Sequence, residues 1–148
     1  MVPLLEITKL IKNYRSPEGE LQRVLDVPEF FLESGQQLAL RGGSGTGKTT
    51  FLNCIAGISR PDEGEIRLDG QDMAHAGESV RDNLRSKNLG YIFQTFNLLQ
   101  GYTCLENVLL GMSFGRGVRL KTATELLDRM GLIDRLNHRP FQLSVGQQ

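Results

Sequence analysis

The chain has 148 residues, one domain's worth at most, and its 39% hydrophobic and 23% charged residues are usual for a globular protein. Lys and Arg together number 17, as do Asp and Glu, and no segment is rich in Lys and Arg, so the charge does not favour binding to nucleic acid. The apolar runs are broken within a few residues, and residues 1–6 lack the layout of a signal peptide. We therefore expect a cytoplasmic protein without a membrane span.

The N-terminal part of the chain has the pattern of a β-hairpin. Residues 4–14 alternate imperfectly between apolar and polar side chains, which is typical of a half-buried strand at the edge of a sheet. Residues 16–19 predict a turn, and residues 24–32 predict a second strand that is interrupted at Pro28. The apolar positions of the first strand are Leu5, Ile7 and Ile11.

The next segment carries the most informative pattern in the chain. Residues 37–41 are a short apolar run between turn residues, which predicts a buried strand, and residues 50–56 have apolar side chains at helical spacing up to Gly57. Between them lies the pattern G-x-x-x-x-G-K-[ST], which we call the P-loop. Its residues are Gly42, Gly43, Ser44, Gly45, Thr46, Gly47, Lys48 and Thr49.

The P-loop predicts a site for the phosphates of a nucleotide. Glycines allow positive φ and close approach, so the N–H groups from about Gly45 to Thr49 can converge on phosphate oxygens at the positive end of the following helix. Lys48 would place a positive charge at the β- and γ-phosphates, the Thr49 hydroxyl could bind Mg²⁺, and Thr50 could bond the α-phosphate. The alternative is a flexible turn with a surface lysine, but the flanking strand and helix favour the nucleotide site.

The remaining elements are predicted from apolar periodicity and turn residues. Residues 65–70 predict a strand, residues 80–86 a short polar helix and residues 89–93 another buried strand. Residues 105–111 and 121–130 predict helices, the second with an apolar stripe for packing. The residues expected in the core are Leu52, Cys54, Ile55 and Ala56 in the helix after the P-loop, and Leu126, Leu127 and Met130 in the stripe.

Three further segments, in the right order around the P-loop, identify a family. Residues 91–94, Tyr-Ile-Phe-Gln, resemble the Q-loop of the ATP-binding cassette (ABC) transporter ATPases, and residues 143–148 resemble their signature motif, L-S-G-G-Q. Tyr14 matches the aromatic A-loop residue of that family. The resemblance extends from about Glu6 to the last residue.

The resemblance implies the fold of the chain. We expect an α/β P-loop NTPase of the ABC ATPase type, with an antiparallel β-subdomain, a partial RecA-like core and a helical subdomain, incomplete at the C-terminus. Residues 1–95 would form the β-subdomain and the P-loop core, and residues 96–148 the helical subdomain up to the signature.

The resemblance also implies roles for residues outside the P-loop. Gln94 would contact Mg²⁺ and the attacking water, so that Lys48 and Gln94 are the expected catalytic residues, and Tyr14 would stack on adenine. Ser144 and Gly146 would bind the γ-phosphate of ATP held by the opposite subunit, and Gln147 would complete these polar contacts. The open alternatives are a strand-end glutamine for Gln94, a cross-strand packing aromatic for Tyr14 and a helix N-cap turn for the signature.

The expected ligands are ATP and Mg²⁺, and the expected partners are a second ATP-binding subunit, forming a homodimer, and transmembrane permease subunits. Residues 93–99 and 103–108 look most like the lipoprotein-releasing and macrolide-export ATPases, whose members lie at the cytoplasmic face of the inner membrane. Substrate, direction of transport and permease are not encoded in these residues.

Two departures from the family bear on activity. Val145 stands where the signature usually has glycine, so we expect an altered fit at the dimer interface. The family's Walker B aspartate and catalytic glutamate are absent from these residues, so we expect an N-terminal fragment that hydrolyses ATP negligibly by itself. The alternatives are a truncated, non-hydrolysing ATP-binding module and, from another class, a small P-loop kinase or GTPase.

Overall fold

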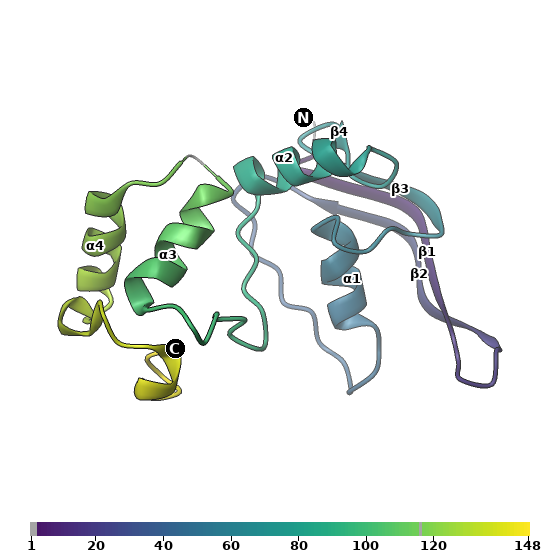
Figure 1. Cartoon of the computed structure of the whole chain (residues 1–148). Helices are drawn as coiled ribbons and strands as arrows, with labels where there is room; N and C mark the ends of the chain where they lie inside the picture. The colour runs from purple at the N-terminus through teal and green to yellow at the C-terminus, as the bar shows by residue number, and fades with distance from the viewer. Residues whose placement is uncertain (1–2, 116) are drawn as a thin grey trace. The chain divides into compact units, whose positions relative to one another are not determined.

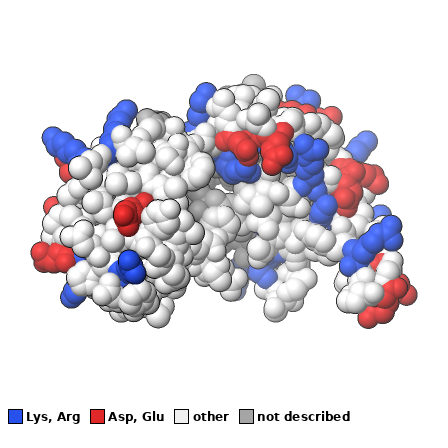
Figure 2. All heavy atoms as spheres, viewed as in Figure 1, with Lys and Arg blue, Asp and Glu red and all other residues white. Residues whose placement is uncertain are grey.

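The computed structural model describes residues 3–115 and 117–148. The chain divides into two compact units, Met1–Leu89 and Gly90–Gln148, which are described separately (Figure 1). Among the described residues, no helix has the length and apolar character needed to cross a bilayer. On the face shown in Figure 2, basic and acidic side chains are interspersed.

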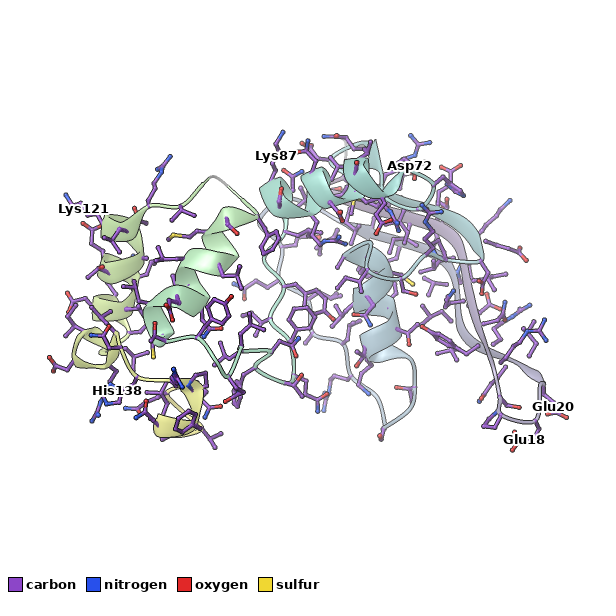
Figure 3. All side chains as sticks on the ribbon, viewed as in Figure 1. Glu18, Glu20, Asp72, Lys87, Lys121 and His138 are labelled. Carbon is purple, nitrogen blue, oxygen red and sulfur yellow. The ribbon has the colours of Figure 1, made fainter. Side chains whose placement is uncertain are left out.

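The first unit is built on an antiparallel four-stranded sheet with the order β2-β1-β3-β4. The predicted hairpin is confirmed, but the edge position of its first strand is wrong, because β1 lies between β2 and β3. The predicted interruption at Pro28 is also wrong: β2 continues through it, since an edge strand tolerates a residue without an N–H. The strands are β1 (Leu5–Arg15), β2 (Leu21–Leu32), β3 (Glu63–Leu68) and β4 (Gln71–Asp72). Figure 3 shows Glu18 and Glu20 at the tip of the β1–β2 ribbon.

A bulge in β1 changes which side chains face the core. Lys9 adopts a φ of 51°, and the pairing of β1 with β3 shifts register between Thr8 and Ile11. Gly64 fits against the bulge, because a Cβ there would lie 2.2 Å from the carbonyl oxygen of Lys9. Leu10 is fully buried as a result, whereas Ile11 is only half-buried. The prediction of Ile11 as an inward position is therefore wrong, because strict alternation assumes an uninterrupted pleat.

The helix after the P-loop, α1 (Lys48–Ile55), packs on the sheet through Phe51 and Cys54. The Phe51 ring meets the Phe30 ring of β2 edge-to-face, with centroids 5.5 Å apart. Cys54 is confirmed as a core residue, and burial raises the pKa of its thiol. Leu52 is 45% exposed, so its predicted burial is wrong: Phe51 sets the inward face, and Leu52 lies about 100° around the helix from it. Ala56 is buried and Ile55 half-buried.

The C-terminal end of α1 is held by α2 (Glu78–Asn88), which contains the predicted short helix. The guanidinium of Arg85 donates to the carbonyl of Ala56 at 3.0 Å, and that of Arg81 donates to the carbonyl of Gly57 at 3.3 Å. Positive charge at this end complements the helix dipole. These bonds fix the C-terminal end of α1 against α2.

Two predicted buried strands do not form among the described residues. Residues 37–41 and 89–93 are not in any strand of the sheet. Leu38 and Ile92 are 57% and 97% exposed. An extended segment becomes a strand only when another strand satisfies its backbone groups, and no described strand pairs with either segment. Apolar composition alone does not determine whether a segment finds a partner strand.

The second unit contains α3 (Cys104–Ser113), α4 (Leu120–Arg129) and two short 3₁₀ helices, Ile133–Arg135 and Pro140–Gln142. Both predicted α-helices are confirmed. Its small core contains Cys104, Leu127 and Leu143. Of the predicted stripe on α4, Leu127 is buried but Leu126 and Met130 are 39% and 70% exposed, and Ala123 takes the inward position instead.

The loop before α3 is organised by side chains of that helix. Thr103 caps it: the Glu106 N–H donates to the Thr103 hydroxyl, and the Thr103 N–H donates to the Glu106 carboxylate, which lowers the pKa of Glu106. Asn107 accepts the Leu99 N–H at 2.9 Å and donates to the carbonyls of Leu99, Tyr102 and Thr103. The loop from Leu99 to Thr103 therefore has a defined conformation.

Candidate nucleotide-binding site

The P-loop wraps around the ammonium group of its own lysine. Lys48 Nζ donates to the carbonyl oxygens of Gly42, at 2.9 Å, and Gly43, at 2.5 Å, and lies 3.3 Å from the hydroxyl oxygen of Thr46. The Thr46 hydroxyl donates to the Gly43 carbonyl at 3.0 Å. These bonds close the loop and fix the position of the positive charge that was predicted for phosphate binding.

Two glycines give the P-loop its path. Gly45 and Gly47 have φ of 77° and 83°, in the left-handed region that favours glycine. A Cβ on Gly47 would lie 2.8 Å from the carbonyl oxygen of Val24 and 2.9 Å from Leu25 Cδ2. The P-loop therefore ends directly against β2, and no larger residue fits there without displacing the strand.

The N-terminal end of α1 has the character of an anion site. Its first backbone hydrogen bond runs from the Phe51 N–H to the Gly47 carbonyl at 2.8 Å, so the N–H groups of Lys48, Thr49 and Thr50 precede the helical bonding pattern. No acidic residue lies in the first turn. Thr49 is exposed, and its hydroxyl has no hydrogen-bond partner among the described residues, which leaves it available to a metal ion. Free donors and the positive end of the helix dipole together suit a phosphate group.

A cavity of about 440 Å³ lies beside the P-loop. One wall of the cavity is apolar and is formed by β2 and by Phe51 of α1, and the other part is lined by Lys48 and by the P-loop residues Gly42, Thr46 and Gly47. The apolar lining residues are Leu25, Val27, Phe30, Leu40 and Phe51.

Tyr14 lies at the end of the sheet that the P-loop reaches. It pairs with Gln22 across the hairpin and is 45% exposed. Two residues earlier in β1, Lys12 pairs with Leu25, the residue against which Gly47 packs. The structure therefore brings the predicted base-stacking residue and the predicted phosphate loop to the same region of the first unit.

An ion pair beside Tyr14 was missed by the sequence reasoning. The carboxylate of Asp62 accepts from Lys12 Nζ at 3.0 Å and from the backbone N–H of Asn13 at 2.5 Å. The N–H of Asp62 donates to the Ile11 carbonyl at 2.9 Å. The pKa of Asp62 is below its ordinary value, mainly because of the bond from the Asn13 N–H and to a lesser extent because of the Lys12 ammonium. We call Asp62, Lys12 and Asn13 the Asp62 clamp. No local pattern could have revealed it, because its members are about 50 residues apart.

Gln94 belongs to the second unit, whereas the P-loop belongs to the first. Its side chain is exposed, and the neighbouring rings of Tyr91 and Phe93 contact each other with centroids 4.5 Å apart. The role of Gln94 at Mg²⁺ and water stays a prediction.

The signature residues form a hydrogen-bonded turn. The N–H groups of Gln147 and Gln148 donate to the Ser144 carbonyl at 2.9 and 3.1 Å, and the Ser144 N–H donates to the Gln147 side chain at 3.1 Å. Val145 is 74% exposed, and neither it nor Gly146 has a positive φ. A Cβ on Gly146 would meet nothing within 4 Å. No described helix follows this turn, so the ATP-binding role of the signature stays a prediction.

Comparison with known proteins assigns the family. The family model described as "ABC transporter" matches residues 25–148. The chain belongs to this family and carries part of its ATP-binding domain, which excludes the small kinase or GTPase considered above.

The chain is similar to ATP-binding proteins of two transport systems. It is 38% identical over 99% of its length to the macrolide export ATP-binding/permease protein MacB 1/2 of Paracoccus denitrificans. It is 36% identical over 98% of its length to the lipoprotein-releasing system ATP-binding protein LolD of Syntrophotalea carbinolica. The resemblance to this group is confirmed. The chain spans 22% of the MacB relative and 65% of the LolD relative.

A solved structure shares the fold. The ATP-binding cassette MJ0796, in a dimeric post-hydrolysis state bound to ADP and Pi, matches 97% of the chain with a TM-score of 0.87 and 33% sequence identity, and 64% of that chain is covered. The predicted ABC ATPase fold is thus confirmed.

Proposed function

We propose that the chain is part of the ATP-binding subunit of an ABC transporter of the lipoprotein-releasing or macrolide-export type. It would bind Mg·ATP and couple its hydrolysis to a membrane permease. The observation that carries this proposal is the P-loop geometry: Lys48 is held in place, and the N–H groups at the start of α1 are free to receive phosphates. The family and the names of the relatives support the transport role.

The donor set of the P-loop suits a Mg·ATP complex. Thr49 would bind the metal through its hydroxyl, and Thr50 would contribute to the phosphate contacts. Gln94 would act at the metal and the attacking water. When bound, Mg²⁺ supplies charge that neutralises the phosphate oxygens in the transition state. Lys48 would stabilise the same charge from the protein side, together with Gln94 as the second catalytic residue.

The signature turn would act on ATP held by a second copy of the subunit. Gly146 is the observation that favours this: neither its φ nor its packing requires glycine, so an approach from outside the chain is a reason for the missing side chain. Ser144 and Gln147 lie in the same exposed turn. Val145 adds an exposed apolar side chain that would alter the fit.

A permease would hold the subunit at the cytoplasmic face of the inner membrane. In the second unit, Leu99 and Tyr102 are 43% and 46% exposed in the loop that Asn107 fixes, which makes them candidates for that contact. We assign residues 1–95 to the β-subdomain and P-loop core and residues 96–148 to the helical subdomain. Hydrolysis would need residues that the relatives carry outside the matched stretch, since the chain spans 65% of the LolD relative.

The test is Mg·ATP-dependent dimerisation, measured by sedimentation of the protein with and without Mg·ATP. We expect a dimer with Mg·ATP, and we expect Gly146→Ala to weaken it while leaving the urea unfolding midpoint unchanged. A monomer at saturating Mg·ATP, in a protein that binds the nucleotide, would contradict the shared site.

A further inference from the structure

Lys12, a member of the Asp62 clamp, contacts the ring of Tyr14. Lys12 Nζ lies over this ring, 5.5 Å from its centroid, while the same atom lies 3.0 Å from the Asp62 carboxylate. A lysine on a strand usually moves freely in water, but the Lys12 side chain is only 14% exposed. The three side chains therefore form a series in which Asp62 holds Lys12 and Lys12 lies against Tyr14.

The clamp also fixes the backbone that carries the ring. Asp62 bonds the backbone at Ile11 and Asn13, on both sides of Lys12. The pairing of β1 with β2 shifts register between Lys12 and Asn13, where the strand would otherwise be free to slip. The position of Tyr14, the next residue along β1, follows from these bonds.

We propose that Lys12 and Asp62 are positioning residues that hold the Tyr14 ring ready to stack on the base of the bound nucleotide. This inference rests on the proposed function and on the predicted role of Tyr14 as the base-stacking residue. The ammonium lies over the ring, and Tyr14 is 45% exposed, so a base can reach it. A ring that is already ordered loses less conformational freedom when the base arrives, so the affinity for the base increases. The cation also attracts the ring directly.

The proposal makes a claim about specificity. The clamp acts on the base and not on the phosphates, which the P-loop binds. Its loss should weaken a ligand that carries a purine base and leave a bare triphosphate unaffected. If the clamp served only to attach β1 to the loop before β3, its loss would change the affinity for both ligands alike or for neither.

The experiment compares Mg·ATP with inorganic tripolyphosphate by calorimetric titration of the protein. Lys12→Met keeps the length of the side chain without its charge, and Asp62→Asn keeps an acceptor for Asn13 without the ion pair. Tyr14→Ala removes the ring. The matched control is Glu65→Gln, which breaks a carboxylate–guanidinium pair of the same length, 3.0 Å, with Arg67 on β3.

We expect Tyr14→Ala to weaken ATP binding by about tenfold, as for a lost stacking contact. Lys12→Met and Asp62→Asn should each weaken it by about threefold, the size of a partly exposed cation–π interaction. Tripolyphosphate affinity should stay within the wild-type error in all three, which also shows that the variants are folded. Glu65→Gln should change neither affinity.

The two claims fail separately. If Tyr14→Ala leaves ATP affinity unchanged, the base-stacking assignment is wrong. If Tyr14→Ala weakens ATP binding but Lys12→Met and Asp62→Asn do not, the positioning role is wrong and the assignment of Tyr14 stands. An equal loss for ATP and tripolyphosphate in both clamp variants also overturns the positioning role.

Discussion

Gly47 packs so closely against β2 that a Cβ on it would lie 2.8 Å from the carbonyl oxygen of Val24. This contact joins the end of the P-loop to the sheet that carries Tyr14. Two features require glycine at this position: its φ of 83° and the close contact with the neighbouring strand. The P-loop and Tyr14 are therefore attached to the same sheet.

The first prediction separates these two requirements. Gly45 has a similar φ, 77°, but a Cβ there would meet nothing within 4 Å. Gly45→Ala should therefore lower the free energy of unfolding by about 1 kcal/mol, the cost of a left-handed alanine. Gly47→Ala should cost about 2 kcal/mol more, because the strand must also move. Urea unfolding of both variants measures the difference, and equal losses would mean that the close contact is not made.

The second prediction concerns acid stability. The pKa of Asp62 is lower in the folded state than in the unfolded state, because the Asn13 N–H and Lys12 favour the carboxylate. Its contribution to stability is fully present above about pH 5 and is lost as the pH falls through the lowered pKa.

Asp62→Asn should therefore destabilise the protein near neutral pH and approach wild-type stability in acid. Thermal unfolding of both proteins between about pH 7 and pH 2.5 measures this convergence. A constant gap between the two curves would show that the ionised form of Asp62 has no special role in the clamp.

The third prediction concerns the second unit. The Asn107 side chain bonds the Leu99 N–H and the Tyr102 carbonyl in the loop before α3, so Asn107→Ala should remove both bonds and cost about 0.5–1.5 kcal/mol. Hydrogen exchange of the Leu99 amide, which donates to Asn107, should become faster. Asn137→Ala is the matched control, because the Asn137 side chain is exposed and has no hydrogen-bond partner among the described residues. Unchanged exchange at Leu99 in Asn107→Ala would contradict the assigned role.

Local patterns predicted the elements whose causes are local. The P-loop and the start of α1 follow from glycine spacing and a neighbouring helix, and the hairpin follows from a turn between two apolar segments. The sequence also indicated the correct family, because the signature and Q-loop residues keep their order. The elements depend on residues close together in the chain, and the family depends on the order of its motifs.

The errors have long-range causes. Ile11 was misplaced because a bulge at Lys9, fitted to Gly64 on another strand, changes the alternation. Leu52 was misplaced because Phe30, far away in the sequence, selects Phe51 as the inward residue. Residues 37–41 and 89–93 have the composition of strands but no described partner. In each case the outcome depends on the presence or absence of a contact with a residue far away in the sequence.

The central claim is that the P-loop binds the triphosphate of ATP, and a titration of Mg·ATP tests it most directly. Lys48→Ala removes the ammonium that the loop holds against Gly42 and Gly43. Lys87→Ala is the control, because Lys87 is exposed and points outward from α2 (Figure 3). We predict that Lys48→Ala weakens affinity by about tenfold to a hundredfold, as for a lost charge-assisted bond, and that Lys87→Ala leaves it unchanged. Equal affinity in wild type and Lys48→Ala would contradict the account.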